Sequence, residues 1–198
     1  MATASNAYVL PINPAERRNP GWWAMVLIIA TEAMLFAYLL FAYFYLGSMA
    51  NTPWPPSGPP ELKLVVPNTI VLLVSSGTMW WAESGIRAGS QLRLRIGMLL
   101  TLLLGIAFLV VQGIEYSKKD FAMQSNAYGS LFFTITGFHG AHVFVGLLFN
   151  VVVELRAWLG HFTAERHLAV TNAAMYWHFV DIVWLVVFTS LYLVPHVM

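Results

Sequence analysis

The chain has 198 residues, of which 59% are hydrophobic and 10% are charged, with a formal net charge of +1. Soluble domains carry about 25% charged residues, so the composition excludes an ordinary water-soluble domain, and the near-zero net charge argues against a nucleic-acid partner. The chain has no cysteine, which excludes disulfides, iron–sulfur clusters and thiolate metal sites.

Residues 1–21 form the first predicted unit, a polar tail on the cytoplasmic side. They lack the charged region, apolar region and small-residue cleavage site that together mark a secretory signal. Arg17 and Arg18, next to Glu16, supply too little basic charge for a transit peptide. We therefore expect no removable leader in these residues.

Five apolar stretches follow, each near the roughly 20 residues needed to cross a hydrocarbon core of about 30 Å. The predicted spans are residues 22–46, 66–86, 96–114, 128–153 and 174–194. The first opens on Trp22 and Trp23, an aromatic pair typical of the membrane interface. The proline-rich stretch 51–63 predicts a loop. The sequence therefore predicts an all-α, polytopic membrane bundle of five transmembrane helices across residues 22–194.

The basic residues between the spans indicate an orientation. One set of alternate segments holds the seven arginines of the chain, and the other set holds its three lysines. Because cytoplasmic segments collect Lys and Arg, the N-terminus is predicted in the cytoplasm and the C-terminus outside. For a bacterial protein, this corresponds to a multi-pass protein of the inner membrane.

Ionisable side chains within or at the ends of the spans are candidate functional groups, because a charge in hydrocarbon is costly. They are Glu32, Glu115, His139, His142, His178 and Asp181. His139 and His142 lie three residues apart on one helix face, as do His178 and Asp181. Such pairs can hydrogen-bond a neighbouring helix and leave no bare charge in lipid. We interpret Glu115, the three histidines and Asp181 as a structural polar network.

A metal or haem site is the alternative for the same residues. A di-metal carboxylate centre uses Glu-x-x-His on two helices, whereas this chain has His-x-x-His and His-x-x-Asp. Bis-histidine haem ligation would take one histidine from each of two helices, for example His142 and His178. Interhelical hydrogen bonds explain these residues more simply, so we expect no metal ligand and no catalytic residue in this chain.

Glu32 lies in the middle of the first span and has two interpretations. A lone carboxyl in hydrocarbon is least costly as the neutral acid, bonded to a nearby Ser, Thr or backbone carbonyl. Alternatively, it is a proton-relay group or a reactive buried carboxyl. The residue chemistry alone favours neither.

Other polar, aromatic and small residues allow further predictions. Arg156 and His161 lie five residues apart at the inner interface, where they suit a phospholipid head group or simply add positive charge. In "YWHFVDIVW" (176–184), we expect most of the aromatic residues to lie in the interfacial belt. Small residues of the fourth span predict close helix approach; these are Gly137, Gly140, Ala141 and Gly146.

Several stretches together resemble subunit III of the haem–copper oxidases, the cytochrome c oxidase family. They are "TEAMLF" (31–36), "VPNTIVLL" (66–73), "EYSKKDF" (115–121), "YGSLFFTITGFHGAHVFVG" (128–146) and "YWHFVDIVWLVVFTSLY" (176–192). The resemblance covers roughly residues 22–194 and is closest to the short, five-helix form. It differs at Glu83 and Ser84, where long members often have two histidines, and at Thr171, where the family often has a glutamate.

The resemblance implies a non-redox accessory subunit of a respiratory oxidase, most similar to the aa3-type cytochrome c oxidase. It implies haem and copper in partner subunits I and II, none in this chain, and bound phospholipid as the associated small molecule. The same resemblance implies that the chain packs against subunit I and contacts subunit II and other respiratory complexes. It also implies that the chain supports proton uptake and the stability of the oxidase.

The resemblance also assigns residues, position by position. Glu32 matches the buried carboxyl of the family that reacts with carbodiimides, and Arg156 and His161 match its lipid-contacting basic residues. The histidines, Glu115 and Asp181 match positions that look structural. Alternative assignments are an accessory subunit of a quinol oxidase or a nitric oxide reductase, or a self-contained membrane transporter or enzyme.

Overall fold

The computed structural model describes residues 19–51, 53–56 and 58–197. Within them are five long helices: α1 (Pro20–Met49), α2 (Val65–Arg87), α3 (Gln91–Ser117), α4 (Ala127–Trp158) and α5 (Leu168–Phe188). The chain continues from α5 through a π-helical segment, η1 (Thr189–Leu193), and a 3-10 turn, η2 (Val194–His196). All five helices are long and apolar enough to cross a membrane, α5 together with its extension. The predicted all-α bundle of five membrane-length helices is confirmed.

Helices α2, α3 and α4 extend beyond their predicted spans because the prediction ended those spans at charged residues. Helix α3 starts at Gln91, before Arg93 and Arg95, and α4 runs through Glu154 and Arg156 to Trp158. A helix keeps its backbone hydrogen bonds beyond the hydrocarbon, and long basic side chains reach from its last turns to water. The predicted tail, residues 1–21, lies mostly outside the described residues, as do Arg17 and Arg18.

Local sequence explains where several helices begin and end. The side chain of Asn19 accepts a hydrogen bond from the Gly21 N–H before α1, and Asn126 does the same for the Gly129 N–H of α4. Both satisfy amides that a helix start leaves without intrahelical partners. After α2, Gly89 adopts a φ of +78°, a left-handed conformation that glycine adopts without strain and that reverses the chain into α3.

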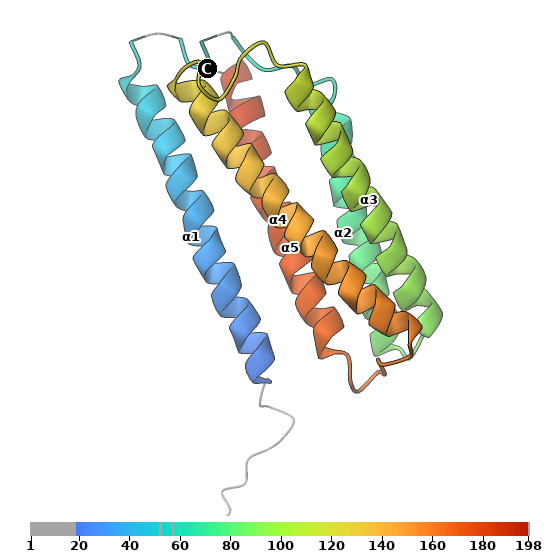
Figure 1. The fold of residues 1–198 in the computed structure, drawn as a ribbon. Helices are drawn as coiled ribbons and strands as arrows, with labels where there is room; N and C mark the ends of the chain where they lie inside the picture. The colour runs from blue at the N-terminus through green and yellow to red at the C-terminus, as the bar shows by residue number, and fades with distance from the viewer. Residues whose placement is uncertain (1–18, 52, 57, 198) are drawn as a thin grey trace, which may run out of the picture.

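The helices form a bundle in which α1 stands to one side. Figure 1 shows α1 beside α4 and α5, with α2 and α3 on the far side of the bundle. Helices α2 and α3 form the tightest pair, and α5 touches α1, α2 and α4. Helix α1 is the least buried span and α5 the most buried, so α5 is the central helix around which the others pack.

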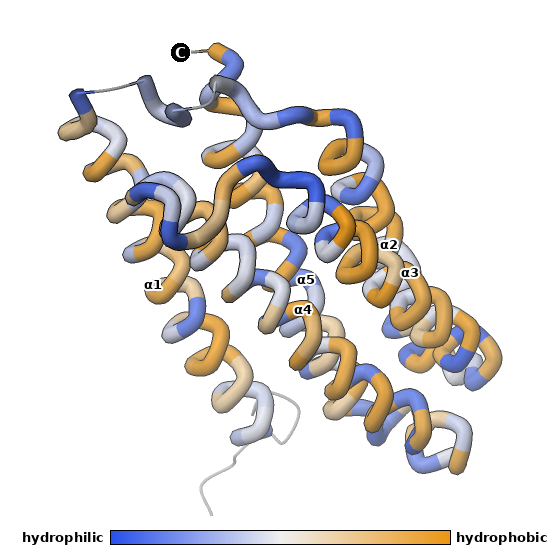
Figure 2. The backbone as a smooth tube through the Cα atoms, turned by 45° about the horizontal axis from the view of Figure 1, so that its top comes forward, coloured by the Kyte–Doolittle hydropathy of each residue, from blue (hydrophilic) through white to orange (hydrophobic). Residues whose placement is uncertain are grey.

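Hydropathy and charge separate along the bundle. In Figure 2 the helices are mostly orange, and blue gathers in the connections at both ends. We call the end where α1, α3 and α5 begin the arginine end, because the described arginines lie there: Arg87, Arg93, Arg95, Arg156 and Arg166. The opposite end, with Lys63, Lys118 and Lys119, is the lysine end.

Two tryptophans of α5 connect the core to α2. Trp177 and Trp184 are each 1% exposed. The Trp177 indole N–H donates to the Ser75 hydroxyl and that of Trp184 donates to the Thr69 hydroxyl, both over 3.0 Å. The expectation that the aromatics of "YWHFVDIVW" lie mostly in the interfacial belt is wrong for these two residues. Their bulk fills the bundle interior, and α2 supplies a partner for each polar N–H.

Of the glycines predicted to allow close helix approach, only Gly146 does so. A Cβ on Gly137 would meet no atom within 4 Å, and one on Gly140 would meet only a Leu109 methyl group at 3.9 Å. Gly146 does sit tightly against Trp177, with ring atoms from 3.1 Å. Closer approaches occur between α2 and α3, where a Cβ on Gly85 would clash with the Arg93 Cβ and one on Gly97 would lie 2.9 Å from the Thr78 carbonyl oxygen.

Candidate functional site

Glu32 of α1 and His142 of α4 form a hydrogen-bonded contact between helices within the membrane-spanning region. The Glu32 carboxyl oxygen Oε2 lies 2.9 Å from His142 Nε2. The pair is partly accessible, with the Glu32 side chain 33% and the His142 side chain 14% exposed. The sequence suggested a Ser, Thr or backbone carbonyl as the partner of Glu32, whereas the structure pairs it with a histidine 110 residues away.

The other ring nitrogen of His142 determines what the pair can do. Nδ1 lies 2.7 Å from the Phe138 carbonyl oxygen, which can only accept a hydrogen bond. Nδ1 therefore carries a proton, and Nε2 either accepts a hydrogen bond from the neutral Glu32 acid or, as part of an imidazolium, donates one to the Glu32 carboxylate. In both states the two groups share one proton and the pair has no net charge. This suits a carboxyl in a membrane.

His139 lies one turn before His142 but in different surroundings. It is 1% exposed, and its ring lies 4.7 Å from the Trp184 ring and 5.8 Å from the Phe108 ring, centroid to centroid. Neither ring nitrogen has a hydrogen-bond partner among the described residues. The sequence suggested that both histidines form interhelical hydrogen bonds, but His139 is held by aromatic packing.

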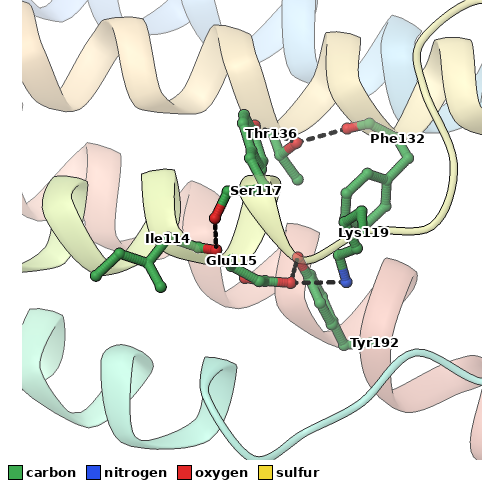
Figure 3. Close-up of polar contacts among 8 residues, drawn as sticks. Ile114, Glu115, Ser117, Lys119, Phe132, Thr136 and Tyr192 are labelled. Atoms are coloured by element: carbon green, nitrogen blue, oxygen red, sulfur yellow. Dashed lines mark hydrogen bonds and ion pairs between the residues drawn. The ribbon is translucent and has the colours of Figure 1, made fainter.

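Glu115 forms an ionic contact at the lysine end of α3. Figure 3 shows its carboxylate reached by two side chains: Lys119 Nζ at 2.8 Å and the Tyr192 hydroxyl at 3.0 Å. Lys119 also lies over the rings of Phe132 and Tyr192, at 5.0 and 5.5 Å. Glu115 is 5% exposed, so this contact ties the loop after α3 to α4 and η1. It borders a pocket of about 380 Å³ that opens at the lysine end.

His178 and Asp181 of α5 face α2. His178 Nδ1 lies 2.6 Å from the Ser76 hydroxyl. Asp181 is 3% exposed, and by hydrogen-bond geometry neither carboxyl oxygen has a partner among the described residues. The predicted same-face pair therefore bonds α2 through its histidine.

Arg156 and His161 lie together at the arginine end, where α4 finishes. Both side chains are exposed, and the His161 N–H donates to the Arg156 carbonyl over 3.1 Å. The Arg156 guanidinium lies 5.4 Å from the Phe162 ring, so its charge is presented at the edge of the bundle beside an aromatic anchor. This is geometry suited to an anionic head group.

The ionisable residues of the spans do not meet at a common centre. Glu32 with His142, Glu115 with Lys119 and Tyr192, and His178 with Ser76 are three separate contacts. In the part of the chain that the structure describes, no three His, Cys, Asp or Glu side chains gather where they could hold a metal ion. The residues present offer hydrogen bonds between helices.

Several partners in these contacts were not predicted from the sequence. Ser75, Ser76 and Thr69 of α2 and Tyr192 of η1 are small or common polar residues in apolar stretches. The sequence did carry a signal for these partners. Thr69 and Ser76 are hydroxyl residues seven apart, which places them on one face of a helix.

Comparison with known proteins identifies the family. A profile described as cytochrome c oxidase subunit III matches residues 19–195. The chain belongs to the cytochrome c oxidase subunit III family. Among similar proteins, cytochrome c oxidase subunit 3 of Arabidopsis thaliana is 39% identical over 180 residues, covering 86% of this chain and 67% of the relative.

Animal members of the subunit III family are equally close. The subunits of Scyliorhinus canicula and Oncorhynchus mykiss are 41% and 42% identical over 180 residues, covering 86% of this chain and 68% of each relative. The chain is therefore a multi-pass membrane subunit of the oxidase, with the other oxidase subunits as partners. The family has no catalytic centre of its own, and the predicted family resemblance is confirmed.

Proposed function

We propose that this chain is a non-redox accessory subunit of an aa3-type cytochrome c oxidase that packs against subunit I, supports its proton uptake and prolongs its activity. The observation that carries the proposal is the arrangement of ionisable groups in the spans. They form separate interhelical contacts such as Glu32–His142 and Glu115–Lys119. Such contacts hold a scaffold together and leave redox chemistry to haem and copper in subunits I and II.

Support for proton uptake is proposed on the basis of Glu32 and His142. The two groups share a proton and are partly accessible from outside the bundle. A pair that holds one proton in either of two positions is a chemically suitable relay or reservoir. Its place in the middle of α1 and α4 makes it accessible only within the membrane or from an adjoining subunit.

The proposed orientation places the arginine end in the cytoplasm and the lysine end outside, in a bacterial inner membrane. It is supported by the separation of the two basic residue types, which the folded chain preserves. Arg156 and His161 then face the inner leaflet, where anionic lipids gather, and we assign a phospholipid head group to them.

A comparison of the oxidase with and without this chain tests the proposal. One form is purified from a strain in which the gene for this chain is deleted. The other is purified from the same strain after the gene is restored. We expect equal haem content and an initial turnover that differs little, but many fewer turnovers before inactivation and slower proton uptake without the chain. Equal lifetimes and equal proton uptake would refute the proposed role.

A further inference from the structure

We propose that one face of the bundle, formed by α2 and α5, docks against a transmembrane helix of a partner oxidase subunit, and that this helix presents a hydrogen-bonding side chain to His178. This inference rests on the proposed function as an oxidase subunit and adds the surface by which the chain binds. We call the surface the α2–α5 face. It is defined by Ser76, Gly77, Trp80, His178 and Ile182.

His178 provides the first argument. Its Nδ1 is bonded to Ser76, and no described residue bonds its Nε2. The ring is partly exposed. It stands ten residues after Leu168, where α5 begins, a distance of about 15 Å along the helix. Lipid tails offer no hydrogen-bond partner at that depth, so a bare ring nitrogen is costly there. A polar group on an adjoining protein helix removes this cost.

Asp181 provides the second argument, because it draws on the same Ser76 hydroxyl as His178. It is 3% exposed, and by hydrogen-bond geometry both carboxyl oxygens lack a partner among the described residues. The Ser76 hydroxyl interacts with it as well as with His178. One hydroxyl thus serves two polar side chains. Asp181 is enclosed, so a partner helix can supply a further hydrogen bond only to the partly exposed His178 ring.

The rest of the α2–α5 face has the features of a helix–helix interface. Trp80 and Ile182 lie one turn beyond Ser76 and His178 and are 65% and 60% exposed. A Cβ on Gly77 would meet no atom within 4 Å. Small residues let a second helix approach closely in a membrane, and polar side chains beside them form interhelical hydrogen bonds.

The outer side of α3 and α4 lacks this combination. The outer side of α3 and α4 exposes aliphatic side chains such as Leu103, Val110 and Leu148, which lipid tails solvate well. His142 also approaches the surface, but both its ring nitrogens are bonded within the chain. Other polar side chains without a partner among the described residues, such as Gln112, His139 and Asn150, are enclosed within the bundle, where a second helix cannot reach them. In the described part of the chain, His178 combines an unpaired ring nitrogen with partial exposure beside an open glycine, which points to α2 and α5.

Site-specific photocrosslinking in the intact oxidase complex tests the proposal. A benzophenone amino acid replaces Ile182 in one variant and Leu148, which is 53% exposed on α4, in the control. We expect irradiation to join the Ile182 variant to another oxidase subunit, identified by mass spectrometry, and to leave the Leu148 variant uncrosslinked to protein. Crosslinking from Leu148 and not from Ile182 would overturn the proposal, as would crosslinks from Ile182 only to a second copy of this chain.

Paired substitutions give an independent readout. Gly77→Leu and Gly113→Leu each add a side chain at an outward glycine whose Cβ meets no atom of this chain, on α2 and on α3 respectively. We expect Gly77→Leu and His178→Phe to lower the haem co-purified with the tagged chain by about fivefold, and Gly113→Leu to leave it unchanged. Equal losses from Gly77→Leu and Gly113→Leu would contradict the docking face.

The wild-type chain separates failure of this inference from failure of the proposed function. If the tagged wild-type chain brings down no haem-bearing subunit, the proposed function fails. If the wild type assembles and the α2–α5 variants assemble equally well, only the docking face is wrong. The thermal unfolding temperature of each isolated variant shows whether a loss reflects misfolding.

Discussion

At the scale of single residues, the Glu32–His142 contact shows how a carboxyl is accommodated in a membrane-spanning helix. The Phe138 carbonyl holds a proton on His142 Nδ1, which directs Nε2 toward Glu32. The shared proton keeps the pair neutral overall. A neutral, hydrogen-bonded pair costs far less in hydrocarbon than an isolated charge.

Substitutions at both positions test this coupling. Glu32→Leu and His142→Phe should each lower the free energy of unfolding in detergent by about 1 kcal/mol, the scale of an interhelical hydrogen bond. The double variant should lose no more than either single variant, because both remove the same contact. Glu32→Gln, whose amide can still donate to Nε2, serves as the control and should retain wild-type stability. Strictly additive losses would show that the two residues act separately.

Arg156 and His161 carry the proposed lipid site, and their removal should change lipid content before stability. Both are exposed, so Arg156→Ala and His161→Ala should leave the fold intact, lower the phospholipid retained by the purified complex and shorten its catalytic lifetime. Arg166→Ala, at the same end, is the matched control. Native mass spectrometry measures the lipid, and unchanged lipid in the first two variants would count against the site.

The special status of Glu32 and the histidines was predictable from the sequence, but their partners were not. A polar residue in an apolar stretch is visible at once, whereas the contact between Glu32 and His142 joins residues 110 positions apart. It depends on how α1 and α4 rotate about their axes. His139 shares a helix face with His142 in the sequence pattern, yet aromatic residues of α3 and α5 enclose it and leave its nitrogens without hydrogen bonds.

At the scale of helices, length and apolarity alone predicted all five spans, because hydrocarbon thickness dictates the minimum length of a transmembrane helix. Packing was harder to predict. The glycines of α4 suggested close contacts, but Gly97 of α3 makes a much closer one against α2. Glycine is frequent in transmembrane helices, so its presence does not tell which face meets a neighbour.

Substitution of Gly97 tests the α2–α3 contact. A Cβ there would lie 2.7 Å from the Ala82 Cβ and 2.9 Å from the Thr78 carbonyl oxygen, and backbone atoms cannot move aside easily. Gly97→Ala should therefore lower the free energy of unfolding by about 1–3 kcal/mol. Gly113→Ala lies in the same helix with no atom within 4 Å and should be neutral or slightly stabilising. Equal effects on thermal unfolding would contradict the packing described for α3.

At the scale of the whole molecule, the arginine and lysine ends give the bundle a direction. The absence of cysteine makes this testable, because single cysteines can be introduced at Lys63 and at Arg166 on opposite ends. A membrane-impermeant maleimide added to intact cells should label Lys63→Cys and not Arg166→Cys, and both should react after lysis. The reverse pattern would invert the proposed topology.

The central claim is that this chain supports an oxidase without carrying its redox centres. The most direct test of this claim is to purify the tagged chain from native membranes by affinity. Its absorption spectrum is then recorded before and after detergent separates the subunits. We predict that the complex shows a haem spectrum stoichiometric with subunit I and that the separated chain is colourless. Haem that remains stoichiometric with the isolated chain, or a tagged chain that brings no haem-bearing subunit, would contradict the claim.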